Sequence, residues 1–227
     1  LIINADCPYL KKINFQHKNI VTYGLHSNAS LGAKHIINKL FQSSFTVDGH
    51  SFEINVPGIY NISNALAAIA VARCLNISND TIAGALRQFK GVQRRMDIVG
   101  KIDGVVVIDD YAHNPEKVKS ALNAVKLSYK RIIAIFQPHG YGPTRFMKKE
   151  LVDAFTSTLS PQDILFMPEI FYAGGTAEKN ISSADIIEQI NDGGKNAFFV
   201  EKREDIIPAI KQHVRAGDCI LAMGARD

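Results

Sequence analysis

The residues best suited to chemistry stand together in DDYAHNP, residues 109–115, directly after the apolar run VVVI. Two adjacent carboxylates can accept hydrogen bonds from hydroxyl groups, and a nearby histidine can bind charge or move a proton near neutral pH. A plain strand-to-helix turn needs only one capping residue, so this many polar side chains favour a site. The structural alternative is that Asp109 or Asp110 caps a helix that Pro115 begins.

Two further polar clusters follow apolar runs in the same half of the chain. QPHGYGPTR, residues 137–145, follows RIIAIF, and PEIFYAGGT, residues 168–176, follows ILFM. In open parallel α/β sheets, ligands bind beside the carboxyl ends of the strands. Three such clusters at one sheet edge favour a functional site over three unrelated turns.

The elements that must position these clusters alternate between apolar β-rich runs and amphipathic helical runs. Strands are expected at 105–109, 131–136, 164–170, 197–200 and 219–224, and helices at 115–128, 146–159, 183–192 and 204–214. Continuous apolar strands separated by helices predict an α/β fold with a mainly parallel sheet covered on both faces.

The first 90 residues have a different pattern. Strands are expected at 1–6 and 19–24, a hairpin within 45–56 and helices at 61–75 and 79–89. The hairpin is indicated by Asp48-Gly49 between two β-rich runs. We therefore expect two domains, 1–92 and 93–227.

The composition is that of a globular protein: of 227 residues, 46% are hydrophobic and 21% charged, with a net charge of +4. This mild charge allows an anionic small-molecule substrate, and no basic run predicts nucleic-acid binding. No apolar segment approaches the roughly 20 residues that span a bilayer, so no membrane association is predicted. Three widely spaced cysteines fit a reducing cytoplasm.

Several familiar signatures are missing from the sequence. It contains no GxxxxGK[ST] phosphate loop, no GxGxxG, no HExxH and no GxSxG. If the protein uses a nucleotide, the main phosphate-binding element is expected outside these 227 residues, and no metal-binding residues are predicted within them.

An ordered set of five motifs resembles the Mur ligases. GIYNISNA (58–65), before an alanine-rich helix, resembles their G-x-H/Y-N-x-x-N-A segment. QRRMD (93–97) resembles the arginine turn between their central and C-terminal domains, and DDYAHNP (109–115) resembles their DDYAHxP motif. FQPH (136–139) and MGA (223–225) resemble the FQPH and MGAGD of the branch that adds L-alanine to UDP-N-acetylmuramate. The resemblance runs over essentially the whole chain.

This resemblance implies a piece of a three-domain enzyme. Residues 1–92 would be the later part of a central α/β ATPase domain, and residues 93–227 a C-terminal Rossmann-like domain. The N-terminal sugar-nucleotide domain and the phosphate loop would lie in missing upstream segments, together with the Mg²⁺ ligands. The chain alone would then be inactive.

The resemblance also implies a reaction. Mur ligases use ATP and Mg²⁺ to turn a carboxylate into an acyl phosphate, which an amine attacks to form an amide in peptidoglycan synthesis. UDP-N-acetylmuramate would supply the carboxylate and L-alanine the amine. Closure of the C-terminal domain would exclude water from the reactive intermediate.

Matching positions assign roles to individual residues. Asn61 and Asn64 would contact the adenine and the nearby phosphate region, and an asparagine amide suits adenine because it donates and accepts at once. Arg95 and Asp110 would hold the ribose and phosphates.

The acceptor amine and the acyl phosphate would face three further matched residues, Tyr111, His113 and His139. With Asp110, the two histidines are the predicted catalytic residues, acting by orientation and charge stabilisation.

The acceptor loop departs from the family pattern. The alanine-adding branch usually reads QPHRYTRT, where two arginines would grip the amino-acid carboxylate; Gly140 and Pro143 stand there instead. Neither can form a bidentate pair with a carboxylate, although Arg145 could substitute. Tyr60 and Arg226 are lesser departures. Three readings stay open: an L-alanine ligase, a ligase with another amino-acid or peptide acceptor, and a non-catalytic module that binds a nucleotide or nucleotide sugar.

Overall fold

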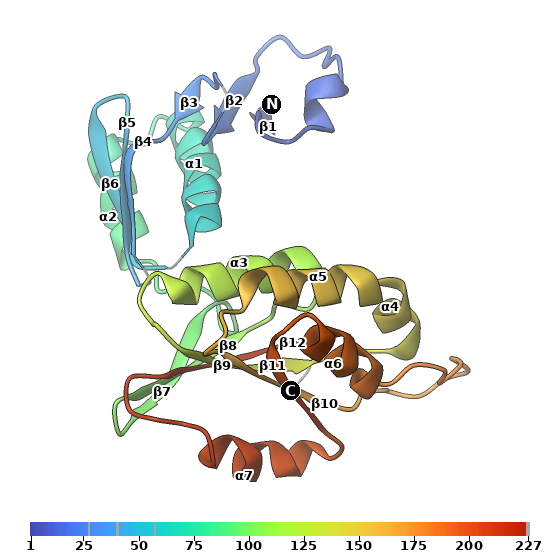
Figure 1. Cartoon of the computed structure of the whole chain (residues 1–227). Coiled ribbons are helices and arrows are strands. Elements are labelled where there is room, and N and C mark those ends of the chain that lie inside the picture. The colour runs from blue at the N-terminus through green and yellow to red at the C-terminus, as the bar shows by residue number, and fades with distance from the viewer. Residues whose placement is uncertain (27, 40, 57, 226–227) are drawn as a thin grey trace. The chain divides into compact units, whose positions relative to one another are not determined.

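The computed structural model of the chain describes residues 1–26, 28–39, 41–56 and 58–225 (Figure 1). The chain divides into two compact units, Leu1–Gly91 and Val92–Asp227. Each unit has its own sheet and its own buried core. Arg226 lies outside the described residues.

The first unit combines a short parallel sheet with an antiparallel one. The parallel sheet consists of β1 (Ile2–Asn4), β2 (Val21–Gly24) and β3 (Leu31–Gly32), with the 3-10 helix η1 (Leu10–Lys12) after β1. The antiparallel sheet consists of β4 (Lys34–Asn38), β5 (Ser43–Val47) and β6 (His50–Ile54). The predicted hairpin joins β5 to β6 through Asp48 and Gly49, whose φ angles of 49° and 81° suit a tight hairpin turn.

Two helices complete the first unit. α1 (Ile59–Cys74) buries Ile62 and Leu66 fully in the core of this unit. α2 (Asn79–Gln88) begins after Ser78, whose hydroxyl caps the helix.

The second unit is built on a six-stranded sheet with the order β11-β10-β9-β12-β8-β7. Its strands are β7 (Asp97–Ile102), β8 (Val105–Asp110), β9 (Ile132–Gln137), β10 (Ile164–Pro168), β11 (Asn196–Val200) and β12 (Cys219–Gly224). Every neighbouring pair is parallel except β7 with β8. The predicted α/β class with a mainly parallel sheet is therefore confirmed.

Helices cover both faces of this sheet (Figure 1). They are α3 (Pro115–Lys126), α4 (Tyr141–Phe146), α5 (Lys148–Thr158), α6 (Ser183–Asp192) and α7 (Ile206–Lys211), the last preceded by the 3-10 helix η2 (Arg203–Asp205). The ring of Phe136 in β9 meets the ring of Phe155 in α5, whereas Ile133 packs in one cluster with Ile206 of α7. Because alternate strand residues point to opposite faces, α5 and α7 lie on opposite sides of the sheet.

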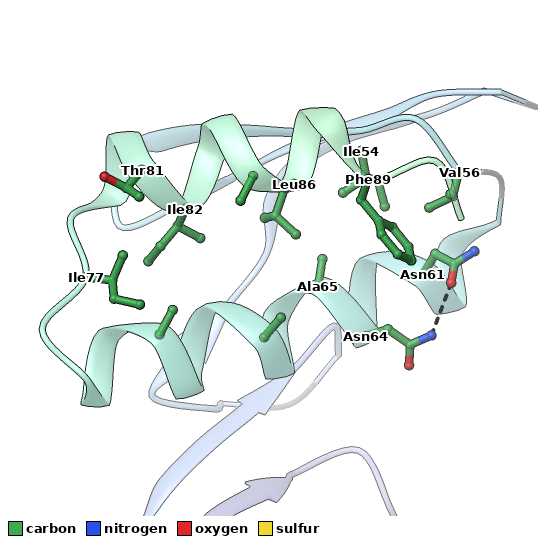
Figure 2. Close-up of a pocket in the computed structure, with 13 residues that line it drawn as sticks. Ile54, Val56, Asn61, Asn64, Ala65, Ile77, Thr81, Ile82, Leu86 and Phe89 are labelled. Carbon is green, nitrogen blue, oxygen red and sulfur yellow. Dashed lines mark hydrogen bonds between the residues drawn. The ribbon is translucent and has the colours of Figure 1, made fainter. Parts of the chain in front are cut away.

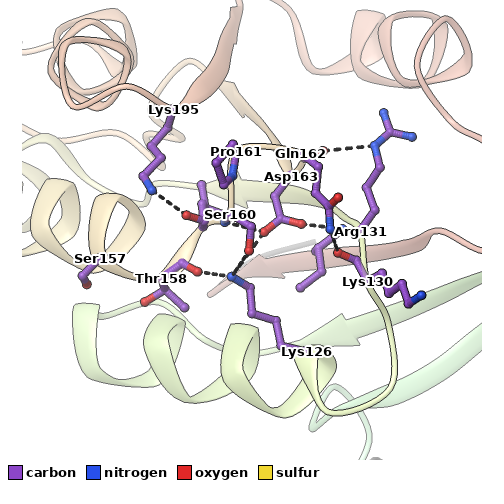
Figure 3. A network of polar contacts seen from close by, with 12 residues as sticks. Lys126, Lys130, Arg131, Ser157, Thr158, Ser160, Pro161, Gln162, Asp163 and Lys195 are labelled. Atoms are coloured by element: carbon purple, nitrogen blue, oxygen red, sulfur yellow. Dashed lines mark hydrogen bonds and ion pairs between the residues drawn. The ribbon is translucent and has the colours of Figure 1, made fainter.

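A buried polar network holds the amino-terminal edge of the sheet together (Figure 3). Asp163, only 1% exposed, accepts hydrogen bonds from Ile132 N at 2.8 Å and Ser160 N at 2.7 Å. Lys126 at the end of α3 places its Nζ 3.3 Å from Asp163 Oδ2. The network thus ties α3 to the starts of β9 and β10, and it leaves the carboxyl ends of the strands for other contacts.

Across the described ranges, no helix has both the length and the apolar character needed to cross a membrane.

Candidate functional site

The end of β8 is tied to the turn that leads into β7. Asp110 closes β8, is 5% exposed, and its Oδ2 accepts a hydrogen bond from Met96 N at 2.8 Å. Tyr111 N donates to Arg94 O at 2.7 Å. Arg94 and Met96 have φ angles of 60° and 53°, a left-handed region that side-chain-bearing residues rarely adopt. Asp110, predicted to bind nucleotide, therefore also holds an uncommon backbone turn.

Burial also changes the acidity of Asp110. Desolvation is the largest effect and raises the pKa of its carboxyl. Hydrogen bonds from the backbone of Met96 and Ala112, and the charge of Arg95, act in the opposite direction without cancelling it.

Two arginines flank the ring of Tyr111. The guanidinium carbons of Arg94 and Arg95 lie 5.2 and 5.6 Å from the ring centroid. Arg94 also donates from Nε to Asp109 Oδ2 at 3.0 Å and from Nη2 to Gly224 O at 3.2 Å. Sequence reasoning named Arg95 and missed Arg94, because two adjacent arginines in a turn carry no signal of which one meets the aspartate.

The helix after this cluster has its own cap. Asn114 Oδ1 accepts a hydrogen bond from Lys117 N at 3.0 Å, and Pro115 occupies the first helical position. The structural alternative for Asp109 and Asp110 is therefore wrong, since neither caps α3.

His113 and His139 line one cavity of about 210 Å³ at the carboxyl ends of the strands. His113 Nδ1 lies 2.8 Å from Tyr111 O; a carbonyl can only accept, so Nδ1 carries the proton and Nε2 of the neutral ring is an acceptor. The His139 ring stacks on Phe171 with centroids 5.5 Å apart. Within the described residues, His139 Nε2 is buried without a hydrogen-bond partner. Such an atom costs about 1–3 kcal/mol unless a bound group satisfies it.

The remaining walls of this cavity are mostly apolar. They are formed by Phe136, Pro138, Pro143, Thr144, Met147, Leu151 and Ala225. Gly140 has a φ angle of 77°, and a Cβ built there would lie 3.3 Å from Pro143 Cδ. The two positions that carry arginine in the alanine-adding pattern thus form a packed, uncharged pair.

Arg145 points to the loop that follows β10. Its Nη1 donates to Asn180 Oδ1 and lies 3.5 Å from Glu178 Oε2. On the same loop, Glu169 Oε1 accepts from Ser183 N at 3.1 Å and so caps α6. Part of the third polar cluster therefore serves helix capping, and Arg145 does not line the cavity of the two histidines.

In the first unit, Asn61 and Asn64 stand at one end of a cavity of about 470 Å³ between α1 and α2 (Figure 2). Asn64 Nδ2 donates to Asn61 Oδ1 at 3.1 Å, and the ring of Phe89 lies at the same end. Gly58 precedes α1 with a φ angle of 91°, and a Cβ there would come within 2.5 Å of the Tyr60 ring. Side-chain amides beside apolar walls fit a flat heteroaromatic base.

A metal site is not formed by the residues described. Within those ranges, no group of three or more His, Cys, Asp or Glu side chains is placed to hold an ion. No Mg²⁺ ligand is therefore assigned among these residues, and the ligands that the family resemblance implies upstream stay a prediction.

Two protein families match the chain. The Mur ligase, glutamate ligase domain matches residues 94–226, and the Mur ligase middle domain matches residues 1–72. The UDP-N-acetylmuramate–L-alanine ligases of Clostridium novyi and Clostridium kluyveri are 36% and 38% identical over 234 and 235 residues. Each alignment covers 100% of this chain and 50% of the relative, so the chain spans about half the length of the curated relatives it matches.

Solved structures show the same likeness. The UDP-N-acetylmuramate–alanine ligase MurC of Thermotoga maritima matches with a TM-score of 0.74 at 26% identity, covering 91% of this chain and 45% of that one. The MurF ligase of Thermotoga maritima in complex with ADP matches with a TM-score of 0.69 at 18% identity, covering 99% and 49%. At that identity the second match shows the fold alone.

Proposed function

The chain belongs to the Mur ligase family, and on this premise we propose that the protein containing it is an ATP-dependent amide ligase. The ligase joins an amino acid, with L-alanine the first candidate, to UDP-N-acetylmuramate in peptidoglycan synthesis. The relatives named UDP-N-acetylmuramate–L-alanine ligase support these substrates. The observation that carries the proposal is the cavity shared by His113 and His139, where the buried Nε2 of His139 has no hydrogen-bond partner among the described residues.

Nucleotide-binding residues are proposed in each unit by itself. Asn61 and Asn64 bind the adenine at the apolar cavity, and Arg95 with Asp110 binds the ribose and phosphates. When bound, ATP supplies the phosphoryl group that activates the carboxylate. Because the described residues offer no magnesium site, no step is assigned to that ion.

The residues proposed to take part in the reaction lie in the second unit. The sugar-nucleotide carboxylate takes the phosphoryl group and ADP leaves; the neutral amine then attacks the acyl carbon, the bond to phosphate breaks, and the amine loses a proton. His113 Nε2 accepts a hydrogen bond from the amine and so orients it. His139 Nε2, which has no hydrogen-bond partner among the described residues, donates to the developing negative charge. Tyr111, whose ring meets the His113 ring edge to face, would face the acceptor amine.

A second candidate differs only in the acceptor. Gly140 and Pro143 stand where the alanine-adding pattern has two arginines, which favours an amino acid or peptide other than L-alanine.

Residues 1–92 and 93–227 would be parts of the ATPase domain and the C-terminal domain. The free thiols of Cys7, Cys74 and Cys219 fit a cytoplasmic location.

The test uses the full-length protein that contains these residues. With ATP, Mg²⁺ and UDP-N-acetylmuramate, phosphate release is recorded across L-amino acids and short peptides. Strongest release with L-alanine supports the first candidate, and release with another amine supports the second. Release with none of them overturns the ligase proposal in favour of a binding module. The 227-residue chain alone is expected to release no ADP.

A further inference from the structure

A lysine stands over a pair of tyrosines beside the acceptor loop. Lys179 Nζ lies 5.2 Å from the ring centroid of Tyr172 and 5.9 Å from that of Tyr141. The two rings meet edge to face, with centroids 5.3 Å apart. Lys179 is exposed, and in the described part of the chain no carboxylate forms an ion pair with it.

The other charged groups on this loop are already engaged. Glu178 and Asn180 contact the guanidinium of Arg145. Glu169 accepts from Ser182 Oγ at 2.5 Å, and Asp185 Oδ2 accepts from Ser182 N at 2.8 Å, so both carboxylates cap α6. Lys179 is therefore the cation of this loop that remains available to an anion.

The Tyr141–Tyr172 pair follows the His139–Phe171 pair along two loops that backbone hydrogen bonds join. The loops after β9 and β10 are bridged by hydrogen bonds from Gly140 N to Phe171 O at 2.8 Å and from Phe171 N to Pro138 O at 2.9 Å. His139 stacks on Phe171. Tyr141, two residues after His139, meets Tyr172, the residue after Phe171. His139 lines the first hollow, whereas a second, more polar one of about 350 Å³ is lined by Tyr141 and Lys179 together with the helix-capping carboxylates of Glu169 and Asp185.

Helix α4 contributes residues to both hollows, with Tyr141 lining the second and Pro143 the first. Gly142 stands between these two residues, and a Cβ built on it would meet nothing within 4 Å. No neighbouring side chain therefore covers the main chain at Gly142 on the side where a Cβ would lie.

We propose that Lys179 binds the carboxylate of the acceptor amine, which lies on the Tyr141–Tyr172 pair with its amino group toward His139. The acceptor class is then an amino acid or short peptide with a free carboxylate. Lys179 takes the part that two arginines play in the alanine-adding pattern, but from the loop after β10. This assignment rests on the proposed ligase function.

The test compares acceptors with and without the charge, in the full-length protein. The best acceptor from the panel and its carboxamide are assayed by phosphate release with Lys179→Gln, Lys179→Arg and the control Lys149→Gln, an exposed lysine on α5. A charged hydrogen bond is worth roughly a tenfold to hundredfold change in KM. Lys179→Gln is expected to raise the acceptor KM by that factor and to erase most of the preference for the free acid. The KM for ATP stays unchanged, Lys179→Arg keeps the preference, and Lys149→Gln matches the unsubstituted protein.

The two proposals fail separately. Phosphate release with an undiminished preference for the free acid in Lys179→Gln overturns the assignment of Lys179 and leaves the ligase standing. Absence of release from the unsubstituted protein with every acceptor overturns the ligase, and the role of Lys179 with it. Release that is as fast with the carboxamide as with the free acid in the unsubstituted protein also overturns the assignment.

Discussion

The carboxylate of Asp110 accepts the backbone N–H of Met96 at 2.8 Å, so the strand end that carries the candidate site also fixes the turn near the start of the second unit. The Asp110 side chain therefore holds a backbone turn and also belongs to the candidate site. A substitution there is expected to show in stability and in activity, and pH can separate the two.

Asp110→Asn should change the pH dependence of unfolding. Burial raises the pKa of the Asp110 carboxyl, so the folded state holds the proton more tightly than the unfolded state. The stability due to this proton is complete below the unfolded pKa and is lost as pH rises through the folded pKa. The unfolding free energy of the unsubstituted chain minus that of Asp110→Asn should therefore fall from acidic toward neutral pH. Urea titrations at several pH values measure this difference, and Asp153→Asn, at an exposed position of α5, is the control. A difference that grows with pH would contradict the raised pKa of Asp110.

His139→Phe should separate folding from ligation. The ring can still stack on Phe171, and the buried Nε2 without a partner is removed, so stability should stay equal or rise by about 1 kcal/mol. Ligation by the full-length protein should fall roughly a hundredfold, as expected when a hydrogen-bond donor to developing negative charge is lost.

Urea midpoints measure the stability of the variant, and steady-state kinetics on the same preparation measure its ligation rate. Full ligation activity in a stable His139→Phe protein would remove this histidine from the mechanism.

Asp163→Ala should be severely destabilising. The substitution removes the acceptor for Ile132 N and Ser160 N and leaves Lys126 partly buried without its ion pair. Breaking a buried pair in this way costs about 3–5 kcal/mol. Asp153→Ala on the exposed side of α5 is the matched control and should stay within about 0.5 kcal/mol of the unsubstituted chain. Equal urea midpoints for the two variants would show that the network contributes little.

Asn64→Ala should weaken nucleotide binding selectively. Losing one neutral hydrogen bond should raise the KM for ATP by about threefold to tenfold in the full-length protein, with the acceptor KM unchanged. Gln88→Ala, at the exposed end of α2, serves as the control. A change confined to the acceptor KM would move Asn64 out of the adenine site.

The parallel strands of the second unit were predictable because each contains a continuous apolar run, and β9 and β10 are buried on both faces. β7 was not predicted, since Val99 and Ile102 are exposed on an edge strand and the register shifts between Ile98 and Gly100. Edge position and a bulge both weaken the alternation that marks a strand.

The predicted helix over 146–159 corresponds to α5, and the short helix α4 before it was not predicted. α4 ends at Phe146 and α5 begins at Lys148, because Met147 leaves helical geometry with φ −96° and ψ 6°. No residue type at this position signals the break.

The candidate site could be located from the sequence but not assembled. The polar residues predicted to follow apolar strands do lie at the carboxyl ends of β8, β9 and β10, and their role as a site stays a prediction. Only the structure shows that Asp110 meets the backbone of Met96, that Arg94 meets Asp109, and that Lys179 stands over two tyrosines. These contacts join segments far apart in the chain or choose between equivalent neighbours, and local pattern carries neither kind of information.

The packed pair of Gly140 and Pro143 constrains how this loop can change over generations. Arginine at 140 alone would need a φ of 77° and a Cβ 3.3 Å from the Pro143 ring, so it brings strain before it brings a useful charge. Replacing Pro143 first relieves that contact. The order of the two replacements therefore matters, because the strain that arginine at 140 brings is smaller once the Pro143 ring is gone.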